Sequence, residues 1–162
     1  KKAQKKGGAG GKKASASSSN NNNNNSDSNE GYRRYTSPSG HPILIGRNSR
    51  QNDQLTMRLA KPGDVWMHAR GVPGAHLLLR VQGKKEGGPS EEDIQYAADL
   101  AIWFSKSREE RRGEVTCADP KDIGKPKGAK PGQVMVKKEW VVVGRPGESV
   151  ACGEVGVLKG IE

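Results

Sequence analysis

The sequence predicts a small α+β domain in which β-hairpins pack against one long and one short helix. Three features support this prediction. Short alternating or β-branched runs recur between turns rich in Gly, Pro and Ser. One longer segment has apolar residues at helical spacing behind an N-capping serine, and a shorter helical segment precedes it. Residues 32–146 have the length of one domain with a single modest core.

The first predicted elements are two short strands, at residues 33–36 and 43–46. The run Ser-Pro-Ser-Gly at residues 37–40 is a typical turn between them. A polar stretch then leads into apolar residues at 55–59, which we expect to form a short helix. Pro62 and the glycine after it end that helix, because proline cannot continue a helical hydrogen-bond pattern.

The next predicted element is a hairpin. Residues 65–70 alternate between two faces, residues 71–75 provide a loop, and residues 76–81 alternate again. With that loop, the cross-strand pairs are Trp66 with Arg80, His68 with Leu78, and Arg70 with His76. One face of the hairpin would then carry an indole, two imidazoles and two guanidinium groups.

The longest predicted helix begins after Ser90, a good N-cap, and its acidic first turn complements the helix dipole. Apolar residues follow at helical spacing, and basic residues crowd the expected C-terminal end before Gly113. The remaining elements are a strand at 114–118, a loop rich in Lys, Gly and Pro at 121–132, and a final hairpin that pairs 134–136 with 140–143.

The two ends of the chain differ from this domain. Residues 1–31 contain no Val, Ile, Leu, Phe, Trp or Met, and we expect a disordered arm there. Residues 147–162 are expected to form a tail or an extra strand. Because the chain does not start with Met, we expect a fragment, a processed product or a stand-alone domain.

The charge of the chain indicates an anionic partner. The formal net charge is +10. The arm contributes six Lys against Asp27 and Glu30, or +4, which leaves +6 for residues 32–162. RNA, DNA or an acidic membrane surface would suit such a domain, although a merely soluble basic protein fits the charge equally well. No apolar run approaches the roughly 20 residues of a membrane-spanning helix, so no membrane partner is expected.

The two cysteines, Cys117 and Cys152, lack a spacing typical of zinc sites or of a disulfide framework. We therefore expect a reducing, intracellular compartment, either the cytoplasm or an organelle. No Ser/His/Asp order indicates catalysis, and His68 and His76 have no convincing third metal ligand. No enzyme activity, cofactor or metal is predicted.

Three groups of residues are candidates for binding RNA. The first stands at the junction of a strand and a helix, where amides, a guanidinium and a carboxylate can contact phosphate, ribose or base edges. Its alternative role is to cap the helix. The members of this group are Arg47, Asn48, Gln51, Asn52 and Asp53.

The second group lies on the predicted hairpin, where aromatic and guanidinium planes could stack on unpaired bases. Its members are Trp66, His68, Arg70, His76 and Arg80, and the alternative is that Trp66 and His68 are interior residues. The third group is Lys125, Lys127 and Lys130, whose loop contains glycines that allow close approach to phosphate. The alternative for these lysines is an ordinary solvated loop.

The same residues carry a family resemblance. Residues 40–56 (GHPILIGRNSRQNDQLT), 64–76 (DVWMHARGVPGAH) and 125–132 (KPKGAKPG) resemble the NFACT-R domain in sequence and in order. That domain is the RNA-binding C-terminal module of ribosome quality-control factors, which bind stalled large ribosomal subunits and recruit tRNA. The resemblance therefore implies tRNA or ribosomal RNA as a partner, and with it the large ribosomal subunit. Gly40 and His41 stand where many members have Asp and Gly.

Three functions follow as hypotheses. The first is an RNA-binding module in translation or ribosome quality control. The second is a protein-interaction adaptor on the ribosome, and the third is an RNA-processing enzyme using His68, His76 and Asp53. The sequence contains no NFACT-N domain, helix-hairpin-helix segment or coiled-coil arm, so extension of a nascent chain is not ascribed to these residues alone.

Overall fold

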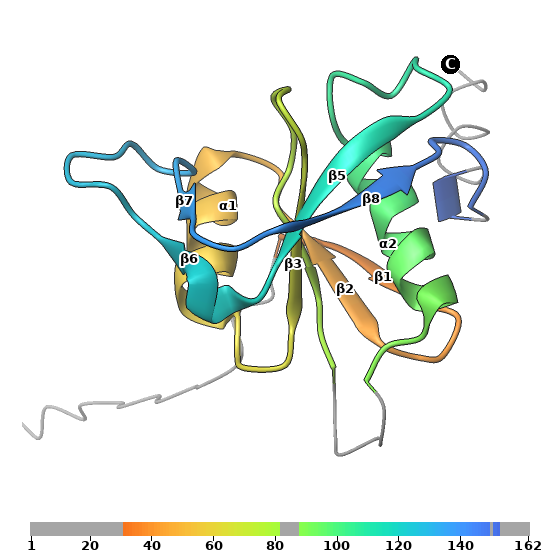
Figure 1. The fold of residues 1–162 in the computed structure, drawn as a ribbon, viewed down its shortest axis with the longest axis horizontal. Helices are drawn as coiled ribbons and strands as arrows, with labels where there is room; N and C mark the ends of the chain where they lie inside the picture. The colour runs from red at the N-terminus through yellow and green to blue at the C-terminus, as the bar shows by residue number, and fades with distance from the viewer. Residues whose placement is uncertain (1–30, 82–87, 150, 153–162) are drawn as a thin grey trace, which may run out of the picture. The chain divides into compact units, whose positions relative to one another are not determined.

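The computed structural model of the chain describes residues 31–81, 88–149 and 151–152. Internal contacts separate residues 1–30 from residues 31–162, and all of the expected disordered arm except Gly31 lies outside the described residues. Within the second unit, a six-stranded antiparallel sheet has the strand order β1-β2-β4-β3-β5-β8. Helix α2 covers one face of this sheet, and α1 with a two-stranded sheet covers the other (Figure 1). The predicted α+β class is confirmed.

Short local signals set the boundaries of the elements. In chain order they are β1 (Arg33–Thr36), β2 (Pro42–Ile45), α1 (Ser49–Gln54), a π-helical turn η1 (Leu55–Leu59), β3 (Val65–Ala69), β4 (Leu77–Leu79), α2 (Glu91–Trp103), β5 (Gly113–Ala118), a 3₁₀ turn η2 (Pro120–Asp122), β6 (Ile123–Gly124), β7 (Met135–Val136) and β8 (Trp140–Gly144).

The larger core lies between the sheet and α2. Alternate residues of β3, such as Met67, face this side together with Leu77 and Leu79 of β4. They pack against the small and aliphatic side chains of α2, including Ala98 and Ile102. All of these side chains are at most 1% exposed. The period-two alternation of the strands therefore meets an amphipathic helix, as the sequence predicts.

The smaller core lies on the opposite face. Trp66 and Leu78 from adjacent strands pack there with Leu44 and Ala118 of the sheet and with Leu55 at the start of η1. Trp66 is only 2% exposed. The predicted face of the hairpin is therefore not an open surface at Trp66, because Leu55 and Thr56 of η1 cover it.

The short helix begins earlier than predicted. α1 starts at Ser49, with the side chain of Asn48 accepting a hydrogen bond from the backbone N–H of Gln51 at 2.9 Å. None of its residues is buried, and the first buried apolar side chain is Leu55 in the following π-helical turn. Apolar residues at helical spacing begin only at Leu55, because α1 itself buries no side chain. The helix start was therefore predicted at residue 55.

The register of the β3–β4 hairpin differs from the prediction by two residues. Trp66 lies opposite Leu78, not Arg80. The connecting loop does not form a tight hairpin, because its backbone pairs with the end of α2 instead. Ala75 N donates to the carbonyl of Phe104 at 3.0 Å, and Lys106 N donates to that of Pro73 at 3.0 Å.

Two predictions about the C-terminal half are wrong. α2 ends at Trp103 with Phe104 as its C-cap, and the basic residues that follow are not helical, because the backbone there pairs with the loop before β4. β7 and β8 do not pair with each other. β7 pairs with β6 in the small sheet, whereas β8 joins the edge of the large sheet beside β5.

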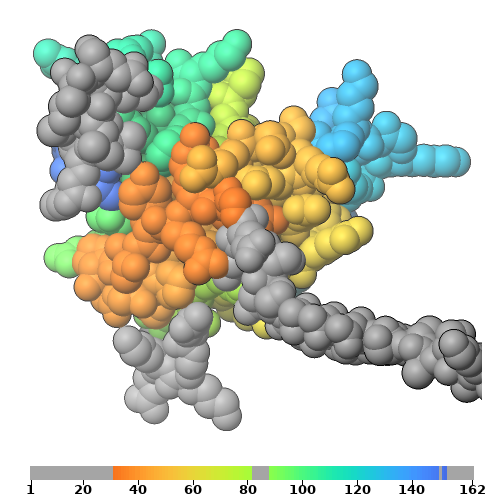
Figure 2. Space-filling model, turned by 180° about the vertical axis from the view of Figure 1, so that it is seen from behind, coloured from red at the N-terminus to blue at the C-terminus, as the bar shows by residue number. Residues whose placement is uncertain are grey.

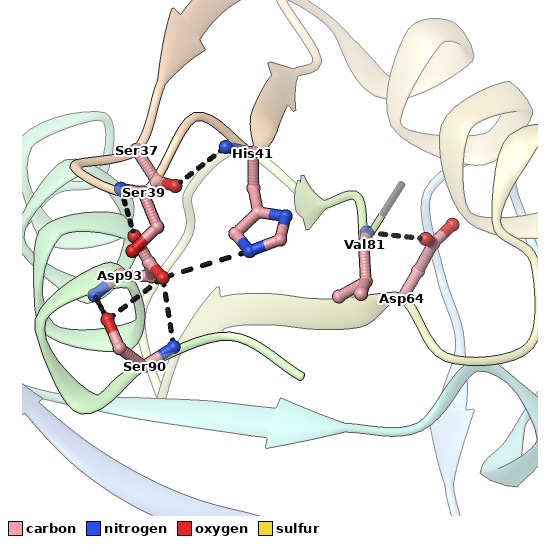
Figure 3. Close-up of polar contacts among 7 residues, drawn as sticks. All are labelled: Ser37, Ser39, His41, Asp64, Val81, Ser90 and Asp93. Carbon is pink, nitrogen blue, oxygen red and sulfur yellow. Dashed lines mark hydrogen bonds and ion pairs between the residues drawn. The ribbon is translucent and has the colours of Figure 1, made fainter. Parts of the chain in front are cut away.

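A buried carboxylate joins the β1–β2 turn to the start of α2 (Figure 3). Asp93 accepts hydrogen bonds from the backbone N–H groups of Ser39 at 2.8 Å and Ser90 at 2.9 Å, and His41 Nε2 lies 3.9 Å away. Burial raises the pKa of Asp93, but hydrogen bonds from Ser39, Ser90 and Ser37 outweigh burial and lower it below its ordinary value. Ionised Asp93 thus fixes the end of the sheet to α2.

Beyond Pro146, the structure packs Ser149, Ala151 and Cys152 on the domain. Ser149 is buried and its hydroxyl donates to the carboxylate of Asp99 on α2. Ala151 and Cys152 belong to the core between the sheet and this helix. The remainder of the predicted tail or extra strand lies outside the described residues.

Candidate nucleic-acid interface

The open end of the smaller core is a pocket of about 510 Å³ beside the Lys-rich loop. We call it the histidine pocket. Strand β3 supplies one wall, the loop before β4 a second, and the segment between β6 and β8 a third. Its lining residues are Trp66, His68, Arg70, Gly71, His76, Thr116, Pro126, Gly132, Gln133, Val134, Val136 and Glu139. The pocket thus brings Trp66, His68, Arg70 and His76, which the sequence predicted as one group, next to the loop that carries the three predicted lysines.

A hydrogen-bond chain ties the floor of this pocket to η1. The indole Nε1 of Trp66 donates to Thr56 Oγ1 at 2.9 Å, and Thr56 Oγ1 lies 2.7 Å from Nδ1 of His76. Since the hydroxyl accepts from Trp66, its own proton can be donated to His76 Nδ1. This arrangement favours a neutral His76 with its proton on Nε2.

The two histidines form an aromatic cluster with Trp66. The rings of Trp66 and His68 are stacked with an interplanar angle of 12°, and His76 meets both rings edge-on. Burial lowers the pKa of His76 to about 4, and His68 reinforces that effect. Burial also lowers the pKa of His68. The cluster therefore presents neutral, partly exposed aromatic surface at His68 rather than positive charge at neutral pH.

Asn52 holds the backbone of His76, immediately before β4, in place. Its side-chain oxygen accepts a hydrogen bond from the backbone N–H of His76 at 3.1 Å, while the carbonyl of His76 accepts from Gly46 N at 3.1 Å. A Cβ at position 46 would lie 2.0 Å from that Asn52 oxygen. Gly46 therefore allows the close approach, and Asn52 supports His76 instead of facing a ligand with this oxygen.

Asp53 anchors the Lys-rich loop to α1. Its carboxylate lies 2.6 Å from the ammonium of Lys125 and accepts a hydrogen bond from Gly132 N at 3.2 Å. The Lys125 hydrogen bond, opposed by partial burial, lowers the pKa of Asp53. The charge of Lys125 is thus matched by a carboxylate, whereas Lys127 and Lys130 are exposed and have no ion pair among the described residues.

The two predicted arginines of the hairpin lie in different surroundings. Arg70 is exposed at the rim of the histidine pocket, and its guanidinium lies 3.4 Å from the carboxylate of Glu139. Arg80 lies outside this pocket, where it donates to the carbonyl of Leu59 at 3.3 Å and lies 3.8 Å from the carboxylate of Asp64. Its partners fit a structural role that fastens η1 to β4.

The start of α1 also lies apart from the histidine pocket. Asn48 caps the helix, and the side chain of Gln51 accepts a hydrogen bond from Arg47 N at 2.9 Å. The first bond matches the capping alternative for Asn48. The guanidinium of Arg47 is exposed in a separate hollow lined by other basic residues.

Comparison with known proteins identifies this arrangement. Residues 31–138 match the family model described as the NFACT protein RNA binding domain. The chain belongs to this family. The matched NFACT domain includes β1 through β7 and every residue of the three groups predicted from the sequence.

Relatives of this NFACT domain are found among bacterial proteins. The chain is 38% identical to the Rqc2 homolog RqcH of Bacillus subtilis over 112 residues, covering 69% of the chain and 19% of the relative. It is 40% identical to RqcH of Streptococcus suis over 102 residues, covering 62% of the chain and 18% of the relative. The chain thus matches about a fifth of these relatives' length.

A solved structure has the same fold. It is the C-terminal part of the fibronectin/fibrinogen-binding protein of Streptococcus suis, with a TM-score of 0.65 and 36% identity. The similarity covers 72% of this chain and 46% of that chain.

The described residues also bear on three other kinds of site: a reactive thiol, a metal centre and a membrane span. Burial raises the pKa of the Cys117 thiol to about 12 and that of Cys152 to about 11, so neither is an activated nucleophile. Among the described residues, no three or more His, Cys, Asp or Glu side chains are grouped as metal ligands. No described helix is both long and apolar enough to cross a membrane.

Sequence reasoning missed several residues that shape the candidate interface. Thr56 is one, because a single threonine in a short helix carries no recognisable signal. Arg33, Trp103 and Phe104 are others, and they line the hollow that contains Arg47. Their proximity depends on the packing of α2 beside β1, which no local pattern reveals.

Proposed function

We propose that this domain binds RNA through the histidine pocket and the exposed lysines beside it, as part of ribosome quality control. The observation that carries the proposal is the position of the anchored Lys-rich loop over a pocket with imidazole walls. Lys127 and Lys130 are available for phosphates, and the partly exposed ring of His68 is available for stacking on a base. Membership of a family described as RNA-binding supports the same function.

The expected ligand is an unpaired RNA segment, such as one in tRNA or in ribosomal RNA of the large subunit. A pocket of about 510 Å³ has room for a base-sized group, whereas bases in a duplex are stacked and their faces covered. The relatives named Rqc2 homologs support a place in ribosome quality control. Binding, rather than turnover, fits the two protonated thiols and the neutral His76.

The proposal is tested by binding of the full chain to tRNA, a large-subunit rRNA fragment and duplex DNA across a salt series. The double variant His68→Ala/Arg70→Ala removes the ring and the rim cation. We expect roughly tenfold weaker RNA binding for this variant. Arg58→Ala is the charge-matched control, because His68 is neutral, and because Arg58 is exposed and lines neither hollow. Equal binding to all three nucleic acids, unchanged by the double variant, would reject the proposed interface.

Protein docking is a second candidate function, supported by the edge strand β8. Trp140, Val141 and Val143 are 39–44% exposed there, and an edge strand can accept another strand. An adaptor function predicts that Trp140→Lys/Val143→Lys abolishes ribosome association while tRNA binding is kept. If RNA binding is the main function, His68→Ala/Arg70→Ala should weaken both tRNA binding and ribosome association. Trp140→Lys/Val143→Lys should then leave both nearly unchanged.

A further inference from the structure

A second basic hollow lies on the other side of the loop before β4. Two adjoining hollows of about 430 Å³ each share Arg33, Arg47, Trp103, Phe104 and Arg108. We call their union the β1–α2 groove. Arg34 and Lys106 complete a set of five cationic side chains, and none of the described acidic residues lines either hollow. Figure 2 shows the side of the molecule on which the orange surface of β1 and β2 adjoins that of α1.

Most cations of this groove have no counter-charge among the residues that the structure describes. Among the described residues, Arg33, Arg34, Arg47 and Lys106 have no ion pair, and Arg108 only approaches its exposed neighbour Glu109 at 3.8 Å. Burial and the nearby Arg47 lower the pKa of Arg33. Bringing like charges together without a counter-charge is unfavourable, so the groove favours an anion that would offset the repulsion.

The walls of the groove are partly aromatic. The guanidinium of Arg33 lies 4.6 Å from the centre of the Phe104 ring, a cation–π contact that orients the planar cation. The buried Nε1 of Trp103 has no hydrogen-bond acceptor among the described residues. An oriented guanidinium is suited to phosphate oxygens, which it can contact with two parallel N–H groups.

The groove and the histidine pocket share a wall. Pro73, Gly74 and Ala75 line the groove, whereas Gly71 and His76 of the same loop line the histidine pocket. A single RNA strand that passes over this loop would therefore reach both hollows. This adjacency favours RNA, because an RNA strand has phosphates for the groove and bases for the histidine pocket. A lipid headgroup or an acidic peptide has no base to place in the histidine pocket.

Building on the function proposed above, we propose that the β1–α2 groove is a second phosphate-binding site, which holds the ribose-phosphate backbone of a strand engaged by the histidine pocket. Arg33, Arg47 and Arg108 contact the phosphates. The interface is therefore bipartite, with base stacking and the exposed lysines on one side of the loop and the arginines of the groove on the other.

The test compares Arg47→Glu/Arg108→Glu with the charge-matched control Arg58→Glu/Lys61→Glu, in the full chain. Affinity is measured by fluorescence anisotropy for single-stranded RNA of about 4 and about 12 nucleotides, lengths that fit one hollow or span both. We expect the groove variant to bind the longer RNA at least roughly tenfold more weakly than the control. Its salt slope should fall by about 0.7 for each phosphate that the variant no longer neutralises. The groove variant and its control should bind the shorter RNA with the same affinity.

The outcomes separate the two proposals. If the groove variant matches its control on the longer RNA while His68→Ala/Arg70→Ala weakens binding, the second site is rejected and the histidine pocket stands. If the groove variant alone weakens RNA binding of both lengths, the histidine pocket is rejected as the primary site. Vesicles containing phosphatidylserine form a third arm. Loss of vesicle binding without loss of RNA binding in the groove variant would assign the groove to lipid headgroups and overturn this inference.

Discussion

The hydroxyl oxygen of Thr56 lies 2.7 Å from Nδ1 of His76 and joins the turn after α1 to the floor of the histidine pocket. The same oxygen accepts the indole hydrogen of Trp66. One buried hydroxyl thus satisfies two aromatic side chains from different segments of the chain. The position of His76 in the pocket depends on this link.

Thr56→Val should therefore be destabilising although it preserves side-chain shape. It leaves the indole N–H of Trp66 and Nδ1 of His76 without partners, at about 1–3 kcal/mol for each buried polar group. Urea unfolding should show a lower free energy of unfolding. Thr56→Ser, which keeps the hydroxyl, is the control and should lose clearly less. Equal losses in the two variants would show that the methyl group, and not the hydrogen bonds, accounts for the effect.

Acidification should destabilise the domain through His76. The pKa of this buried histidine is lowered from 6.5 to about 4, so the folded state favours the neutral ring. The resulting stability is fully present above about pH 6.5 and is lost as the pH falls towards 4. The loss is on the order of 2–3 kcal/mol. Unfolding of His76→Gln across this range should show a flatter pH dependence, and an unchanged profile would argue against a neutral His76.

Asp93 should act in a more acidic range. Its pKa is lowered below the ordinary value of 3.8, so its contribution is present above that pH and is lost as the pH falls further. Asp93→Asn should lower the free energy of unfolding at neutral pH by roughly 2–4 kcal/mol, because several donors lose a charged acceptor. Glu92→Gln, at an exposed position of the same helix turn, should have little effect. Similar losses in the two variants would contradict the role given to Asp93.

Asp53 should control the position of the Lys-rich loop. Asp53→Ala removes the partner of Lys125 and the acceptor of the Gly132 N–H. Faster amide hydrogen exchange at Gly132 and weaker RNA binding should follow, with global stability nearly unchanged. Asp122→Ala, which changes an acidic residue outside this ion pair, is the control. Retained protection at Gly132 in Asp53→Ala would mean that the anchor lies elsewhere.

Local signals were sufficient for much of the fold. Ser90 and the acidic residues that follow it correctly predicted the start of α2. The alternation of apolar and polar residues correctly predicted β3. The turn at residues 37–40 correctly separated β1 from β2. These features are encoded within a few neighbouring residues, so the sequence alone revealed them.

The errors arose where distant segments decide the structure. The runs that became β7 and β8 looked like partners, but each pairs with a different strand earlier in the chain. The loop before β4 bonds to the end of α2, which set both the hairpin register and the end of that helix. Pairing across long separations is not visible in periodicity.

In the candidate site, too, local patterns were predictable from the sequence and long-range contacts were not. The sequence selected Trp66, His68 and His76 together, and the structure brings their rings into contact. It could not show that η1 covers Trp66, which is why truncating this buried residue would test stability and not binding. Nor could it show that Asp53 already neutralises Lys125.

RNA binding beside the histidine pocket can be examined through the affinity of the full chain for tRNA after charge reversal of the two unpaired lysines. Lys127→Glu/Lys130→Glu is compared with Arg58→Glu/Lys61→Glu, which makes the same change in net charge away from the pocket. We predict at least roughly tenfold weaker binding for the loop variant than for the control, and a smaller salt slope. Equal affinities and slopes in the two variants would contradict this mode of binding, since net charge alone would then explain the attraction.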